Sequence, residues 1–176
     1  MPNAPSKRAD AARNRDKILA AARAAFADPD AEVSMAEVSR RAGVGMATLY
    51  RNFPGRRELL EALYTEEVDA VCAAAADAPD LTSWLRAFFA FSTAKRHIAA
   101  ELLTHVAGTD PVFDDNRTRV LATGRPLLEA AQRAGEVRPD LSLEQVLDMV
   151  IAIARIQGDA GYVEPILDAA FAGLRP

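Results

Sequence analysis

The stretch that most constrains this chain runs from residue 34 to residue 60, because it carries start and stop signals for two short helices. Ser34 and Glu37 have the spacing of a capping box, in which each side chain accepts a hydrogen bond from the other residue's backbone N–H group. Apolar residues then recur at spacings of three and four, at Met35, Val38 and Ala42. Gly43 can adopt the left-handed conformation that ends a helix. The sequence therefore predicts a short helix between Ser34 and Gly43.

A second short helix is expected directly after the turn. Gly45 is an acceptable N-cap, and Pro54 prevents the helix from continuing. Two helices of about eight residues joined by a short, glycine-containing turn match the helix-turn-helix, whose second helix lies in the DNA major groove. Helical hairpins that serve only packing share this pattern, so the chemistry of the exposed face decides between the two. That face would present groups suited to base edges and phosphates, on Met46, Ala47, Thr48, Tyr50, Arg51 and Asn52.

Residues 18–64 contain a further pattern, made of Ile18, Leu19, Ala22, Phe26, the Ser34 cap, Arg41–Val44, Thr48–Phe53 and Arg57–Leu60. This pattern resembles the N-terminal domain of the TetR family of transcriptional regulators. It implies an all-α fold, with a three-helix, helix-turn-helix DNA-binding head joined by a long helix to a helical ligand-binding and dimerisation body. It also implies that Thr48, Tyr50 and Arg56 contact the DNA backbone. The predicted DNA-binding residues are Ser34, Met46, Ala47, Thr48, Tyr50, Arg51, Asn52 and Arg56.

Charge is distributed unevenly along the chain. The formal net charge of −4 over 176 residues argues against binding to a polyanion. Residues 1–60, however, hold 11 Lys or Arg against 7 Asp or Glu, whereas residues 61–176 hold 10 against 18. A basic N-terminal part and an acidic remainder suit a DNA-binding head whose body stays away from DNA. Two solvated surfaces of different sign are the alternative interpretation.

The domain boundaries follow from these patterns. Residues 1–9 contain two prolines and no apolar period, which predicts a flexible tail. We expect a helix-turn-helix DNA-binding domain over residues 10–60 and an effector-binding and dimerisation domain over residues 61–176. No apolar run approaches the roughly 18 residues that a membrane span needs, and the first ten residues lack the apolar middle of a signal peptide. We therefore expect a cytoplasmic protein with no membrane partner.

Aromatic residues cluster in the expected helix after Asp80, where Trp84, Phe88 and Phe91 share one side. Such a cluster fits either a core helix or the lining of a ligand pocket, and the sequence does not decide between them. The predicted pocket for a small-molecule effector comprises Tyr64, Trp84, Phe88, Phe91 and His105.

Both histidines fall in the next expected helix, from about residue 95 to residue 107. His97, Glu101 and His105 are spaced four and four, so they lie on roughly one helix face. No further Cys or His completes a metal site, so polar contacts near a pocket or interface are favoured over a metal, and no metal or cofactor is predicted.

The C-terminal part contains a second capping box, at Ser142 and Gln145. Before it, we expect a loop over residues 108–115 and a helix with a break or a kink at Gly124–Pro126. The helix after Ser142 is apolar on two faces, which predicts that one face meets the core and the other a second subunit. The predicted homodimer interface includes Leu147, Ile151 and Phe171.

Catalytic motifs are missing from the sequence, which has no nucleophile elbow, no phosphate-binding glycine loop and no paired-cysteine motif. We therefore expect no enzyme. The favoured function is a ligand-responsive transcriptional regulator, a repressor that binds a palindromic double-stranded DNA operator as a homodimer and is released by a small-molecule effector. The alternatives are a small all-α ligand-binding protein or enzyme that uses the aromatic pocket, and a helical scaffold without DNA binding.

Overall fold

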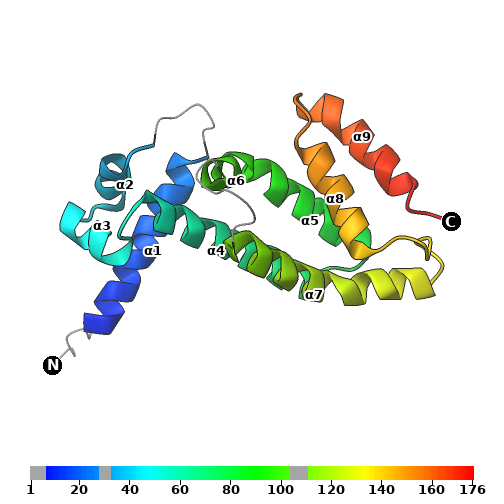
Figure 1. The fold of residues 1–176 in the computed structure, drawn as a ribbon, viewed down its shortest axis with the longest axis horizontal. Helices are drawn as coiled ribbons and strands as arrows, with labels where there is room; N and C mark the ends of the chain where they lie inside the picture. The colour runs from blue at the N-terminus through cyan, green and yellow to red at the C-terminus, as the bar shows by residue number, and fades with distance from the viewer. Residues whose placement is uncertain (1–6, 28–32, 104–110) are drawn as a thin grey trace. The chain divides into compact units, whose positions relative to one another are not determined.

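The computed structural model describes residues 7–27, 33–103 and 111–176, and every regular element within these ranges is an α-helix (Figure 1). The expected all-α fold is confirmed. Within the described ranges the helices are α1 (Lys7–Ala25), α2 (Met35–Ala42), α3 (Met46–Asn52), α4 (Arg56–Asp77), α5 (Leu81–Ala94), α6 (Arg96–Leu103), α7 (Pro111–Arg133), α8 (Leu143–Ala154) and α9 (Ala160–Ala172). The chain forms two compact units, residues 1–64 and residues 65–176, and α4 runs through the division between them.

In the first unit, α1 packs against both α2 and α3. The apolar side of α1 is enclosed, with Ile18 and Ala22 fully buried and Leu19 at 1% exposure. Val38 of α2 and Leu49 of α3 are also fully buried. One inward residue from each short helix thus holds α2 and α3 against the longer α1, since helices this short depend on packing for their stability.

The turn between α2 and α3 has the expected conformation. Gly43 is left-handed, with φ 64° and ψ 31°, and its N–H lies against the carbonyls of Ser39 and Arg40. The Val44 N–H donates to the Ser39 carbonyl at 3.2 Å, and the buried Ser39 hydroxyl donates to the Val44 carbonyl at 2.6 Å. Gly45 is the N-cap of α3. The two bonds between Ser39 and Val44 fix the direction in which α3 leaves the turn.

The second unit is organised around α5, which packs against α6, α7 and α8. Leu81, Trp84, Leu85 and Phe88 form its buried stripe, at the spacing of one helix face. The Trp84 ring is fully buried, and its Nε1–H donates to the carbonyl of Val71 in α4 at 3.1 Å. This bond satisfies the only polar atom of the indole, so the ring can sit in the core without an unpaired donor.

Helix α7 is continuous from Pro111 to Arg133, so of the two alternatives expected at Gly124–Pro126 the break is wrong. Residues 111–115 of the expected loop lie in α7, because Pro111 occupies the first helical position, where its missing N–H costs nothing, and residues 108–110 lie outside the described residues. Val120, Gly124, Leu128 and Ala131 are buried along one stripe. Packing along this stripe holds the helix together across Pro126.

Polar contacts tie the second-unit part of α4 to its neighbours. Asn116, a buried residue of α7, donates from Nδ2 to the Thr65 hydroxyl at 3.3 Å. Arg119, one turn further along α7, pairs with Asp69. The ammonium group of Lys95 lies 3.2 Å from a carboxylate oxygen of Glu67. These contacts fix α4 at three positions within little more than one helical turn.

Helix α8 begins at the predicted capping box, in which both reciprocal bonds between Ser142 and Gln145 are present. It packs against α5, α7 and α9, and these helices cover most of its apolar surface. Leu147 is 1% exposed and Phe171 is 8% exposed, so both belong to the core of their own unit. Their assignment to a subunit interface does not fit this burial. Ile151 is only half-buried and keeps apolar surface for a partner.

One arginine of α5, Arg86, contacts three residues of α9. The guanidinium of Arg86 pairs with Glu164 and Asp168 on successive turns of α9, and it lies over the Phe171 ring at 5.5 Å. Arg86 therefore combines two ion pairs with a cation–π contact. The described helices include none that is both long and apolar enough to span a membrane.

Candidate nucleic-acid interface

One side of α3 is exposed and the opposite side is buried. Leu49 is fully buried, whereas Met46 and Tyr50 are 39% and 46% exposed. Ala47 and Arg51 are also exposed. Met46, Ala47, Tyr50 and Arg51 stand at helix positions one, two, five and six, so they share a face. We call these four residues the recognition face. It offers a thioether, a methyl group, a phenol and a guanidinium, which can contact bases and phosphates.

Arg51 and the two other predicted residues of α3, Thr48 and Asn52, bond within the helix. Arg51 donates from Nε to the Ala47 carbonyl at 3.1 Å and from Nη2 to the Thr48 hydroxyl at 2.9 Å. Asn52 donates from Nδ2 to the Thr48 carbonyl at 2.8 Å. Thr48 and Asn52 are half-buried. A contact from these three side chains to DNA would therefore share or replace a bond made inside α3.

Ser34 and Arg56 are brought together, although 22 positions separate them in the sequence. Arg56, the first residue of α4, donates from Nη1 to the carbonyl of Val33, directly before Ser34. The Arg56 guanidinium also lies 5.1 Å from the centre of the Phe26 ring. The start of α4 is thus fastened beside the start of α2, and Arg56 has a structural role whether or not it also meets a phosphate.

A further contact in the first unit joins residues that sequence analysis did not connect. The Arg15 guanidinium lies 4.6 Å from the centre of the buried Phe53 ring. Phe53 is the C-cap of α3, so this cation–π contact supports the end of the recognition helix from α1. The two residues lie far apart in the sequence, and no short spacing could have revealed the pair.

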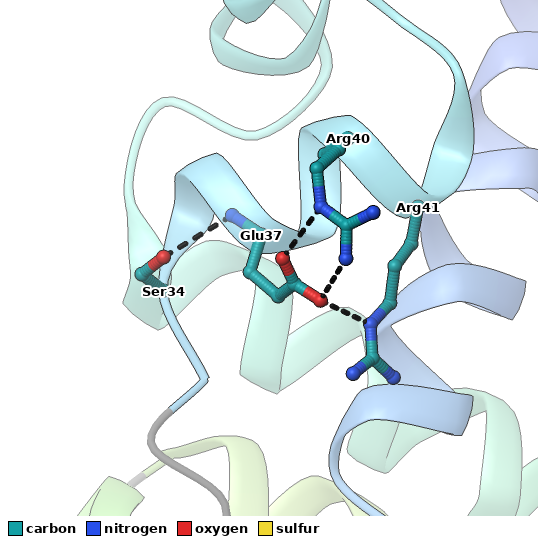
Figure 2. A network of polar contacts seen from close by, with 4 residues as sticks. All are labelled: Ser34, Glu37, Arg40 and Arg41. Atoms are coloured by element: carbon teal, nitrogen blue, oxygen red, sulfur yellow. Dashed lines mark hydrogen bonds and ion pairs between the residues drawn. The ribbon is translucent and has the colours of Figure 1, made fainter.

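Glu37 bonds to two arginines instead of completing the expected capping box (Figure 2). Its backbone N–H donates to the Ser34 hydroxyl at 3.1 Å, as predicted. Its carboxylate, however, accepts from Arg40 Nε at 2.9 Å, from Arg40 Nη2 at 2.7 Å and from Arg41 Nε at 2.6 Å. We call these three side chains the Glu37 clamp. Three bonds from positively charged donors, two of them from the planar fork of Arg40, outweigh a single bond from the neutral N–H of Ser34, which explains the choice of partner.

The clamp shifts the acid–base equilibrium of its carboxylate. Hydrogen bonds from Arg40 and Arg41 lower the pKa of Glu37 from 4.5 to about 2. Glu37 therefore remains charged throughout the neutral range, and the same bond raises the pKa of Arg40. One negative charge is shared by two positive charges on the surface of α2.

A pH titration should reveal this clamp. We expect the Glu37 carboxyl carbon to titrate by NMR near pH 2 and to return toward 4.5 in an Arg40→Gln, Arg41→Gln variant. Because the folded-state pKa is depressed, the stabilising contribution is present above about pH 4.5 and is lost as the pH falls toward 2. A midpoint near 4.5 in the parent would show that the clamp is not formed in solution.

The residues of the predicted effector pocket differ in their surroundings. Trp84 stacks on Phe88 with ring centres 6.1 Å apart, and Phe88 meets Phe91 at 5.9 Å. The series passes from the fully buried Trp84 through Phe88, at 5% exposure, to the half-buried Phe91. Tyr64, at the end of the first unit, is half-buried, and burial raises the pKa of its phenol. His105 lies outside the described residues.

Two of the three residues expected on one helix face, His97 and Glu101, lie within the described part of the chain. His97 is exposed on α6, and Glu101 is half-buried. Because His105 is outside the described ranges, the three-residue arrangement is not tested. Within the described ranges, no three His, Cys, Asp or Glu side chains are grouped so that they could hold a metal ion.

Comparison with known families agrees with this geometry. Residues 18–63 match the family described as bacterial regulatory proteins, tetR family. Residues 74–176 match the family described as the C-terminal domain of SbtR-like transcriptional regulators. The chain belongs to the TetR family. This TetR-family protein is therefore a DNA-binding transcriptional regulator and not an enzyme.

Relatives and solved structures extend over nearly the whole TetR-family chain. An HTH-type transcriptional regulator of Mycobacterium bovis is 30% identical over 92% of this chain and 89% of its own. The crystal structure of a TetR transcriptional regulator from Streptomyces coelicolor has 35% identity and a TM-score of 0.73, covering 92% of this chain and 98% of that one. The TetR transcription regulatory protein from Mycobacterium vanbaalenii has 30% identity and a TM-score of 0.68, covering 96% and 99%.

Proposed function

We propose that this TetR-family regulator is a repressor that binds a pseudo-palindromic operator as a homodimer and is released by a small-molecule effector. The observation that carries the DNA-binding part is the recognition face on α3, formed by Met46, Ala47, Tyr50 and Arg51. In this proposal residues 10–60 bind DNA and residues 61–176 bind the effector and the second subunit. Met46 and Ala47 would touch base edges, while Tyr50 and Arg56 would contact phosphates.

Selection of bound fragments from genomic DNA tests the operator proposal. A two-fold dimer presents two recognition helices, so the recovered fragments should share an inverted repeat whose half-sites lie one helical turn or a multiple apart. Binding should weaken steeply with added salt, because phosphate contacts release counterions. Recovery of fragments with no shared repeat, or binding that ignores salt, would contradict the proposal.

We propose that the subunit interface lies within residues 142–174, on the surface that α8 and α9 leave uncovered. Ile151 is half-buried in the single chain, and Tyr162 at the start of α9 is 62% exposed. Large apolar side chains at the surface of α8 and α9 are what a second copy would bury. Leu147 is buried within its own chain, so it adds no area to this surface.

A charge at Ile151 should disrupt the dimer. We expect Ile151→Asp to shift the protein from dimer to monomer at micromolar concentration, because an unpaired carboxylate would be buried between subunits. Light scattering coupled to size-exclusion chromatography measures the mass. The control is Ala130→Asp, which adds the same charge at an exposed position of α7 and should leave the mass unchanged. A dimer that persists in Ile151→Asp would place the interface elsewhere.

For the effector, we propose a mostly apolar small molecule that binds in the second unit near Phe91, whose ring contacts Phe88 and through it Trp84. Trp84 and Phe88 are core residues in this structure, so the half-buried Phe91 is the member with surface left for a ligand. Because α4 belongs to both units, a ligand that prefers one position of α4 could bias DNA binding, with a typical coupling of about 1–3 kcal/mol. Trp84, the only tryptophan, offers the readout. A ligand that releases DNA without altering Trp84 fluorescence would place the pocket elsewhere.

A further inference from the structure

The two arginines of the Glu37 clamp lie at the end of α2 that leads into the recognition helix, whereas Glu37 lies in the first turn of α2. Arg40 and Arg41 stand in the last turn of α2, and the turn at Gly43–Gly45 connects that end to the first residue of α3. Their side chains are 72% and 42% exposed. In a helix-turn-helix the first helix crosses the DNA backbone while the second enters the major groove. The two guanidinium groups therefore belong to the surface that approaches phosphates.

A carboxylate and a phosphate compete for the same donors. The planar fork of an arginine bonds either group with two parallel N–H bonds, and in Glu37 the carboxylate already engages the Arg40 fork through both oxygens. The oxygen that accepts from Arg40 Nη2 also accepts from Arg41 Nε. Any phosphate that binds these arginines through the same donors must displace Glu37.

We propose that Glu37 acts as an electrostatic brake on DNA binding, because its carboxylate holds Arg40 and Arg41 away from the phosphate backbone. This inference rests on the proposed function of the α3 recognition face. The brake acts on every sequence alike, since phosphates carry no sequence information. The brake therefore lowers the affinity for the operator and for random DNA by the same factor, so their ratio, the specificity, stays the same while less protein is held on random DNA.

Glu37→Gln tests the brake because it removes the charge and keeps the size. Glutamine is an accepted residue three positions after a serine N-cap, and its amide oxygen can still accept one arginine bond. We expect affinity for a random-sequence duplex to rise about tenfold at low salt. The slope of log affinity against log salt should steepen by about one to two per head, because up to two more phosphates are neutralised. Fluorescence anisotropy over a salt series measures both quantities.

Two further variants separate release of the arginines from a change in net charge. Asp16→Asn removes one negative charge from an exposed position of α1 in the same unit and should raise affinity much less than Glu37→Gln. In the Arg40→Gln, Arg41→Gln background, Glu37→Gln should give no gain, since no donors are left to release. Circular dichroism confirms that each variant keeps its helices.

The outcomes distinguish the brake from the underlying function. If the parent binds duplex DNA and Glu37→Gln binds with the same or lower affinity and an unchanged salt slope, Glu37 only presents the arginines and the brake is overturned. An equal gain in Asp16→Asn would also overturn it, because net charge alone would explain the effect. If the parent does not bind DNA at low salt, both the brake and the repressor proposal fail.

Discussion

Ala47→Glu is expected to lower operator affinity about a hundredfold or more, because it places a carboxylate in the middle of the recognition face. Ala47 is exposed on the second residue of α3, so the added side chain has room and leaves the buried Leu49 contact intact. A negative charge in the first turn of a helix is favourable for the helix itself. Against DNA, the same charge meets phosphates and base acceptors, and placing like charges together costs several kcal/mol.

The measurement is a binding isotherm by fluorescence anisotropy, on the selected operator and on a random duplex. Ala130→Glu is the matched control, since it makes the same substitution at an exposed position of α7 in the second unit. It should lower affinity only slightly, by its effect on net charge. Near-parental binding by Ala47→Glu, with helicity intact by circular dichroism, would show that α3 does not face the DNA.

Elements whose signals lie within a few residues could be predicted from sequence. The left-handed Gly43 ends α2, Gly45 begins α3, and the capping box at Ser142 begins α8, as their local spacing indicated. In each case the interacting groups are at most five residues apart, so no knowledge of the fold is needed. The alternation of buried Leu49 with the exposed residues around it also follows from helical periodicity alone.

Local spacing fails to predict the structure where several partners compete for one group, or where packing against distant residues outweighs a local preference. Glu37 can reach the Ser34 N–H or the two arginines, and periodicity does not rank these bonds. The Pro126 signal for a broken helix is real, but contacts made by the buried stripe of α7 outweigh it. Likewise, the apolar width of α8 led to the prediction that one face meets the core and the other a second subunit. It could not show that α5, α7 and α9 of the same chain would cover Leu147.

The close packing of Trp84 against Gly124 could not be predicted from the sequence either. A substitution at this contact has the largest effect on stability that we expect. A Cβ atom added at Gly124 would meet three carbons of the Trp84 ring, the farthest of them Cζ2 at 3.0 Å. The ring is fully buried, its Nε1–H is fixed on Val71, and Phe88 stacks against it. It therefore has no free direction in which to move. The glycine that looked like a helix interruption is instead the space that the indole fills.

Gly124→Ala should accordingly lower the free energy of unfolding by about 1–3 kcal/mol, the typical cost of overpacking a filled core. Alanine stabilises a helix interior by up to about 1 kcal/mol relative to glycine. The measured loss of stability is therefore smaller than the cost of the steric clash alone. Chemical denaturation followed by Trp84 fluorescence measures the change. Gly161→Ala in α9 is the matched control, since its Cβ would meet only the Asp159 carboxylate at 3.4 Å, and it should be neutral or stabilising.

A double-mutant cycle identifies the indole as the cause of the loss. Replacing Trp84 with the smaller phenylalanine opens space beside residue 124, so Trp84→Phe and Gly124→Ala together should cost less than the sum of the single variants. Circular dichroism provides the signal, because the cycle removes the tryptophan. Strict additivity, or a Gly124→Ala variant as stable as the parent, would mean that α5 and α7 are not in contact through this ring. The core of the second unit would then need a different arrangement around Trp84.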